Sequence, residues 1–95
     1  MQQTSVVAVV VSYRPDERLY RALDALAPQV GRTVIVDNGS DAEAVGRLEA
    51  VADTSAGKTT LIRNAENAGL AAAQNQGIRF ALEDGADWIL LMDDD

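Results

Sequence analysis

Cysteine and histidine are both absent from the 95 residues of this chain. Without cysteine there is no disulfide framework, no thiolate nucleophile and no cysteine-based metal site, which fits a reducing cytoplasm. A bound metal would therefore need oxygen ligands, which favours Mg²⁺, Mn²⁺ or Ca²⁺. Proton transfer would have to use Asp, Glu, Tyr or Lys.

Basic residues are also scarce, since 8 Lys and Arg stand against 15 Asp and Glu and give a net charge of −7. Nucleic-acid-binding domains carry the opposite balance, so we expect no DNA or RNA partner. The apolar run at residues 6–11 is far too short to span a bilayer, and residues 1–3 lack the basic start of a signal peptide. We expect a cytoplasmic location, with the inner face of the membrane as the alternative for a full-length protein.

The hydrophobic pattern alternates between strand-like and helix-like segments. With 47% hydrophobic residues, one small domain can bury a real core. Short apolar runs predict buried strands at residues 6–11, 33–36, 59–62 and 87–92. Helical spacing predicts helices between them, so the order is β-α-β-α-β-α-β with short connections. This order predicts an α/β fold, a Rossmann-like parallel sheet with flanking helices.

Local signals predict the ends and faces of the helices. The first helix has one apolar stripe, formed by Leu19, Leu23, Leu26 and Val30. Ser40 with Glu43 three residues later makes a capping box, which predicts the start of the second helix. The third helix contains Gly77, which costs about 1 kcal/mol against Ala and indicates close packing on the sheet. Near one side of this helix lie Leu70, Gln74, Ile78, Ala81 and Leu82.

Polar residues follow every predicted strand at its carboxyl end. They are Ser12, Tyr13 and Arg14, then Asp37 and Asn38, then Arg63 and Asn64, and finally Asp93, Asp94 and Asp95. In an open parallel sheet, ligands bind outside the carboxyl ends of the strands. The topology places Asp37 and the terminal aspartates on the same edge, which indicates a ligand site there.

The terminal aspartates predict a metal site. At 5 Å and an effective dielectric near 20, each pair of like charges costs on the order of 3 kcal/mol. A divalent cation removes this cost, and Mg²⁺ and Mn²⁺ bind carboxylates together with substrate phosphates. Alternate residues of a strand point the same way, so Asp93 and Asp95 are the expected ligands while Asp94 turns aside. The alternative is a solvated acidic end without a metal.

Two further motifs have competing interpretations. Asp37 either accepts N–H or O–H donors from a nucleobase or ribose, or only closes an Asp-Asn-Gly turn. Residues 52–59, ADTSAGKT, fit a loose phosphate-loop pattern, which must follow a strand and open a helix. Here the pattern follows a predicted helix and opens a predicted strand, so Lys58 is expected to be a solvated loop residue.

Four stretches together resemble the amino-terminal half of inverting family 2 glycosyltransferases with the GT-A fold, and the bacterial rhamnosyltransferase branch in particular. They are VVVSYRPD at 9–16, VIVDNGSD at 34–41, NAENAGLAAAQNQGI at 64–78 and WILLMDDD at 88–95. The resemblance covers nearly the whole chain and depends on the order and spacing of all four.

The resemblance implies roles for the strand-end residues. Ser12, Tyr13 and Arg14 would wall the nucleotide pocket, and Asp37 would contact the base. Asn67, Gly69 and Asn75 would close over the nucleotide. The D-x-D motif would bind the metal and the donor diphosphate, with Asp93 and Asp95 on the metal and Asp94 beside the nucleotide. This chain has Asn38 where many relatives carry a second Asp, and Asp94 where that branch often has another residue, so which two aspartates bind the metal stays open.

The resemblance also implies an activity, namely sugar transfer from a nucleotide donor to a polysaccharide or glycolipid acceptor. Rhamnose from a dTDP- or UDP-type donor is the expected substrate, in the synthesis of a bacterial cell wall or surface polysaccharide. We expect residues 1–95 to be the donor-binding subdomain, with the acceptor site and the catalytic base beyond the D-x-D motif. Such a fragment would transfer no sugar and would self-associate through an exposed sheet edge.

Two rivals give different expectations for the same strand ends. A non-catalytic α/β binding domain of the receiver type would gather its acids after the first and third strands, with a late Lys. A sugar-phosphate nucleotidyltransferase would need a Gly-rich loop after the first strand, where this chain has Ser12-Tyr13-Arg14-Pro15. Neither pattern is present. The alternative to the transferase is therefore not one of these two families but, more generally, a non-catalytic α/β domain that binds a nucleotide, a metal or a partner.

Overall fold

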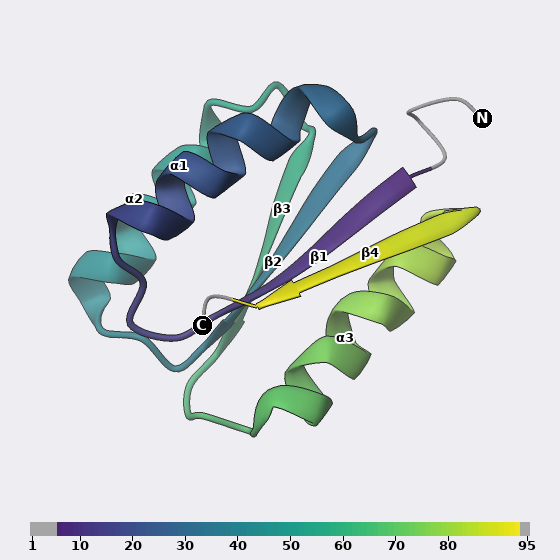
Figure 1. Ribbon diagram of the computed structural model, residues 1–95. Coiled ribbons are helices and arrows are strands. Elements are labelled where there is room, and N and C mark those ends of the chain that lie inside the picture. The colour runs from purple at the N-terminus through teal and green to yellow at the C-terminus, as the bar shows by residue number, and fades with distance from the viewer. Residues whose placement is uncertain (1–5, 94–95) are drawn as a thin grey trace.

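A computed structural model describes residues 6–93 of the chain. Its sheet contains four parallel strands in the order β3-β2-β1-β4. Figure 1 shows α1 and α2 on one face of this sheet and α3 on the other. The strands are β1 (Val6–Ser12), β2 (Arg32–Asn38), β3 (Thr59–Asn64) and β4 (Trp88–Asp93). The helices are α1 (Glu17–Leu26), the 3-10 turn η2 (Ala27–Gln29), α2 (Ala42–Asp53) and α3 (Leu70–Glu83). The predicted α/β fold is confirmed.

The middle of each central strand, residues 6–11 of β1 and 34–36 of β2, is apolar because helices cover both faces of the sheet. Along β1, Ala8 and Val10 belong to a core shared with α1 and α2. Val7, Val9 and Val11 point to the other face and pack with α3. The same alternation continues into the last residues of β1 and β2, and it decides which side of the sheet each polar strand-end residue faces.

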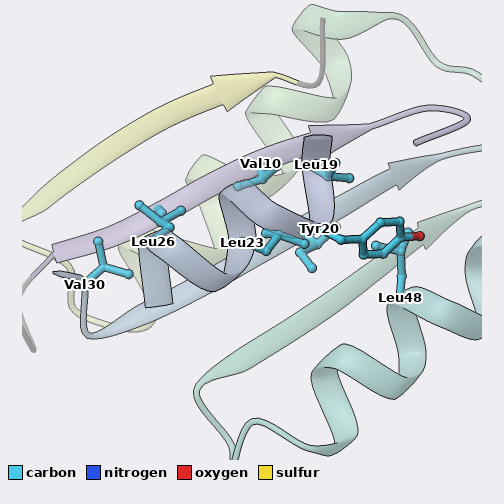
Figure 2. Packing of buried hydrophobic residues seen from close by; sticks show 9 residues of the cluster. Val10, Leu19, Tyr20, Leu23, Leu26, Val30 and Leu48 are labelled. Carbon is cyan, nitrogen blue, oxygen red and sulfur yellow. The ribbon is translucent and has the colours of Figure 1, made fainter. Parts of the chain in front are cut away.

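Helix α1 packs through its predicted apolar stripe but ends earlier than predicted. The side chain of Asp16 accepts a hydrogen bond from Arg18 N at 2.9 Å and caps the helix. All four residues of the stripe are buried and Tyr20 joins them, but α1 ends at Leu26, so Val30 follows η2 in extended backbone and is not part of the helix. Figure 2 shows these side chains against Val10 of β1 and Leu48 of α2. Arg47 of α2 contacts the outer surface of α1. Its Nη1 donates a hydrogen bond to Glu17 Oε1 at 2.6 Å, and its guanidinium lies 3.7 Å from the Tyr20 ring centroid.

Helix α3 packs through small residues, which corrects the predicted stripe. Its buried residues are Ala73, Gly77 and Ala81. Leu70 and Leu82, predicted to lie on one side of the helix with Ala81, are 48% and 62% exposed. The close packing predicted at Gly77 is confirmed, because a Cβ there would collide with Val9 Cγ1 and lie 3.2 Å from Val36 Cγ2. Larger side chains on this face would hold α3 away from the sheet.

The capping box predicted for α2 is wrong. Asp41 is the N-cap, and its side chain accepts a hydrogen bond from Ala44 N at 2.9 Å. Ser40 instead bonds to residues outside the helix, through both its backbone N–H and its hydroxyl. Strand β2 also runs two residues further than predicted, so Asp37 and Asn38 belong to the strand itself.

Strand β4 forms one edge of the sheet in the described part of the chain. Large apolar side chains are exposed along it, namely Trp88, Leu90 and Leu91. An open edge with exposed apolar residues can pair with another chain. The predicted self-association stays a prediction, and this strand is where it would occur.

Candidate functional site

The carboxyl ends of β4, β1 and β2 lie side by side at one end of the sheet. Here the edge of the site means this row of strand ends and not the outer strand β4. Ser12 lies opposite Asp37 in the register of β1 and β2. On the other side of β1, Asp93 lies opposite Val11. Three strand-end residues that are far apart in sequence are therefore neighbours along this edge, as the topology predicted.

Ser12 and Asp37 form a buried polar pair at this edge, and both are 0% exposed. One carboxylate oxygen, Asp37 Oδ2, accepts a hydrogen bond from Ser40 N at 3.0 Å. The other oxygen, Asp37 Oδ1, and the hydroxyl Ser12 Oγ have no hydrogen-bond partner among the residues that the structure describes. By strand alternation both side chains lie on the face covered by α1 and α2.

The missing partners make this pair a candidate contact for a ligand. A buried polar atom without a partner costs about 1–3 kcal/mol, so such atoms are uncommon unless they bind something. Asp37 Oδ1 can only accept while the carboxyl is ionised, whereas Ser12 Oγ can donate or accept. The pair is thus complementary to a group that offers an N–H or O–H beside another polar atom.

The turn after β1 is held in a strained conformation next to this pair. Arg14 has φ +50°, which costs a non-glycine residue about 1–3 kcal/mol. Its backbone N–H donates to Ser40 Oγ at 2.8 Å, and its guanidinium lies 5.0 Å from the centroid of the Tyr13 ring. Tyr13 is 40% exposed and Arg14 is also exposed, so both side chains are accessible to solvent at this end of the sheet.

Ser40 therefore belongs to the site, which sequence reasoning missed by assigning it to a helix cap. It bonds to Asp37 through its N–H and to Arg14 through its hydroxyl. The spacing of Asp37 and Ser40 is the signal that could have found the first contact, because Asp side chains commonly accept from a backbone N–H a few residues later. The contact with Arg14 joins residues 26 apart and leaves no local signal.

Asn38 faces the opposite side of the sheet and contacts the β3–α3 loop (residues 65–69). Its Oδ1 accepts from Ala68 N at 2.8 Å and from Asn64 Nδ2 at 3.3 Å. Its Nδ2 donates to Asn67 Oδ1 at 3.0 Å and to Gly69 O at 3.2 Å. This residue, which entered the sequence comparison only as a departure, is the centre of a hydrogen-bond network.

The structure brings two of the three predicted closing residues to the edge. Asn67 Oδ1 accepts from Asn38 and, at 2.8 Å, from Gly69 N. Gly69 has φ +89° and immediately precedes α3. Asn75 is exposed within α3, five residues after the helix begins and roughly 7 Å along its axis. The hydrogen bonds described for this network do not include Asn75, so its predicted role stays a prediction.

The predicted metal ligands are only partly within the described residues. The backbone of Asp93 ends β4 beside β1, and Asp94 and Asp95 lie outside the described residues. Among the side chains that the structure describes, no group of three or more acidic residues gathers as a metal site would. The placement of Asp93 on the same edge as Ser12 is compatible with a carboxylate-bound Mg²⁺ or Mn²⁺ there, and the metal stays a prediction.

The phosphate-loop pattern lies at the opposite edge. It follows α2 and leads into β3, which is the reverse of the context that phosphate binding requires. The carbonyl of Lys58 accepts from Thr33 N at 2.9 Å near the start of β2, and the residue is exposed. Lys58 is a loop residue, as predicted. No helix within the described range has the length and apolar character of a membrane span.

Comparison with known proteins gives consistent relatives. A family model described as Glycosyl transferase family 2 matches residues 7–95. The chain is 36% identical over 93 residues to the dTDP-rhamnosyl transferase RfbF of Shigella flexneri, covering 97% of this chain and 30% of that protein. It is 37% identical over 94 residues to the galactofuranosyltransferase GlfT1 of Mycobacterium tuberculosis (strain CDC 1551 / Oshkosh), covering 96% and 30%. The chain thus spans about 30% of the length of these relatives.

Proposed function

This chain belongs to glycosyl transferase family 2, and from that membership we propose that the whole protein transfers a sugar from a nucleoside-diphosphate donor to a polysaccharide or glycolipid acceptor. Residues 1–95 form the donor-binding part. The observation that carries the proposal is the buried pair of Ser12 Oγ and Asp37 Oδ1, which has no hydrogen-bond partner within the described part of the chain and lies where parallel sheets bind ligands.

The pair recognises the base or ribose of the donor. Asp37 Oδ1 accepts a hydrogen bond from a base N–H or a ribose O–H, and Ser12 Oγ contacts the neighbouring polar atom. The Tyr13-Arg14 turn lies beside them and offers an aromatic ring and a cation to the nucleotide. A dTDP- or UDP-type donor fits this acceptor, because both bases carry a ring N–H between two carbonyls.

The sugar is either rhamnose or a related hexose. One relative is named a dTDP-rhamnosyl transferase and the other a galactofuranosyltransferase, at 36% and 37% identity. These identities do not separate the two sugars, so rhamnose is supported by the resemblance alone. The predicted cytoplasmic location likewise rests on sequence only.

The terminal aspartates would hold a Mg²⁺ or Mn²⁺ ion for the donor diphosphate. Asp93 and Asp95 are the proposed ligands, with Asp94 beside the nucleotide, and strand β4 carries the first of them to the level of Val11. When bound, such an ion neutralises the diphosphate and assists departure of the nucleotide. The residues of this chain orient the base and ribose, and the acceptor site and catalytic base are assigned to the part of the relatives that this chain does not span.

Calorimetric titration of residues 1–95 with UDP, dTDP, GDP and ADP tests the proposal, each with Mn²⁺ and with excess EDTA. We expect UDP or dTDP to bind best and the affinity to fall when the metal is removed. Equal affinity in EDTA would refute the metal assignment. No binding of any nucleotide would refute the donor site itself, and nucleotide binding without transfer by a protein of the relatives' full length would favour the non-catalytic alternative.

A further inference from the structure

We propose that Asn38 is a positioning residue that fixes the β3–α3 loop beside the nucleotide site, and that this role requires an amide rather than a carboxylate. The inference rests on the proposed function, because the loop is expected to close over the nucleotide. It goes further by assigning a role to a residue that touches no proposed ligand atom.

Two backbone groups fix the orientation of the Asn38 amide. Ala68 N carries a hydrogen and must face the amide oxygen, at 2.8 Å. Gly69 O is a carbonyl and must face the amide nitrogen, at 3.2 Å. Because one partner can only donate and the other can only accept, the side chain at position 38 has to offer both an acceptor and a donor.

The side chains around Asn38 extend the same requirement. Asn64 Nδ2 donates to Asn38 Oδ1, and Asn67 Oδ1 accepts from Asn38 Nδ2. Asn64 and Gln76 of α3 exchange two hydrogen bonds, at 2.7 and 2.9 Å. The network thus consists of neutral amides that connect the end of β2, the end of β3 and the first turns of α3.

Gly39 fixes the same loop by contact. Its φ is +94°, and a Cβ on it would lie 2.8 Å from both Asn67 N and Glu66 C. The loop backbone therefore rests directly on Gly39 while its amide and carbonyl groups bond to Asn38. Asp37 precedes these residues and carries the proposed base contact, so the loop and that carboxylate are positioned by one short segment.

Asn38→Asp is the sharpest perturbation, because it keeps the size of the side chain and both accepting contacts. It turns the two donated bonds into contacts between a carboxylate oxygen and the acceptors Asn67 Oδ1 and Gly69 O. These contacts are repulsive, and we expect the loop to move and nucleotide affinity to fall by about 10-fold at pH 8. Gln29→Glu is the charge control: it makes the same amide-to-carboxylate change at an exposed residue before the far end of β2, where one donated hydrogen bond, to Ala25 O, is also lost.

The pH profile separates positioning from a general loss of structure. Surrounded by acceptors, the introduced carboxyl has a raised pKa, and its protonated form regains one donor. The affinity of Asn38→Asp relative to wild type should therefore recover as the pH is lowered from about 8 to about 5.5. The charged residues adjacent in sequence to Asn38 and to its partners Asn64 and Asn67 are Asp37, Arg63 and Glu66, and they are present in both proteins, so the ratio removes their effect.

The experiment titrates wild type, Asn38→Asp, Asn38→Ala and Gln29→Glu with the best-binding nucleotide and Mn²⁺ at both pH values. Amide hydrogen exchange of Ala68 and Gly69 is measured without nucleotide, with the β1 amides as the internal reference. We expect faster loop exchange in both Asn38 variants, weaker binding in both, and recovery at low pH in Asn38→Asp only.

Unchanged loop exchange would overturn the proposal, and so would faster exchange with normal nucleotide affinity. An affinity ratio that stays constant with pH would overturn the requirement for an amide. If wild type binds no nucleotide, the proposed function fails, while the exchange measurement still decides whether Asn38 holds the loop.

Discussion

Gly77→Ala should destabilise the protein, although alanine is the better helix former. Gly77 lies in the interior of α3, where replacing Gly by Ala gains about 1 kcal/mol of helix propensity. Against this gain stands the contact with the sheet. The new Cβ would collide with Val9 Cγ1 and lie 3.2 Å from Val36 Cγ2.

The surroundings of Gly77 leave little room for relief. Val9 and Val36 are both fully buried in the central strands, so neither side chain can move away without disturbing the sheet. Overpacking of a core typically costs about 1–3 kcal/mol, and a collision with two buried valines falls at the upper end. After the propensity gain we expect a net loss of about 1–2 kcal/mol, or about 5–15 °C in Tm for a domain of this size.

Gly46→Ala provides the matched control within the same protein. Gly46 lies inside α2, and a Cβ there would have no neighbour within 4 Å. The same chemical change should therefore stabilise by up to about 1 kcal/mol. Urea denaturation of wild type and both variants, followed by circular dichroism, measures the two effects. Equal stabilisation by both substitutions would refute the close approach of α3 to the sheet.

Four other results would test the structure and the proposed site. Asp37→Ala should weaken nucleotide binding by about 1–3 kcal/mol and leave Mn²⁺ affinity nearly unchanged, whereas normal nucleotide binding or an unfolded variant would favour a structural role alone. Lys58→Ala should barely alter nucleotide affinity, and a loss of tenfold or more would return the phosphate-loop pattern to consideration. The hydrogen bond from Arg47 lowers the pKa of Glu17 below its ordinary 4.5. The stability lost in Glu17→Gln should therefore be largest at neutral pH and should shrink as the pH falls through and below that value. A difference in stability that does not change with pH would contradict the ion pair. Residues 1–95 should self-associate through the exposed edge β4, and a monomeric mass throughout a concentration series in analytical ultracentrifugation would contradict this.

The strands and the packing of α1 could be predicted because their signals are local. Continuous apolar runs mark strands that are covered on both faces, and β1 is such a strand. In α1 the large residues at helical spacing are also the buried ones. The common edge of Ser12, Asp37 and Asp93 followed from topology alone, because parallel strands end on the same side of their sheet.

The face of α3 could not be predicted from large residues because the helix lies too close to the sheet for them. Its contact face consists of Ala73, Gly77 and Ala81, while Leu70 and Leu82 remain exposed. A search for a hydrophobic stripe favours the most apolar residues, whereas a helix that lies close to a sheet needs small residues on its contact face. Of this face, the sequence identified Gly77 and Ala81 but not Ala73.

The contacts of Asn38 and Ser40 were missed because their partners are distant in sequence. Asn38 bonds to residues 26 to 31 positions away, and Ser40 bonds to Arg14 across 26 positions. Ser40 followed by Glu43 matches a capping box, but the actual cap is the next residue, Asp41. The capping-box rule placed the start of α2 within one residue but assigned the wrong side chain as the cap. It failed because the hydroxyl of Ser40 accepts a hydrogen bond from Arg14 instead of capping the helix.

The segment at residues 37–41 explains why this part of the sequence is so polar although β2 is buried. Asp37 has one carboxylate oxygen without a hydrogen-bond partner among the described residues, and Ser40 links that carboxylate to the turn after β1. Between them, Asn38 and Gly39 hold the β3–α3 loop through hydrogen bonds and direct contact. Asp41 then caps α2. Five consecutive residues thus connect three loops of the edge, and each needs its own residue type: an acceptor, an amide, a residue without Cβ, a hydroxyl and a cap. A substitution within this segment should therefore disturb the geometry of the whole edge, even where the changed residue touches no ligand.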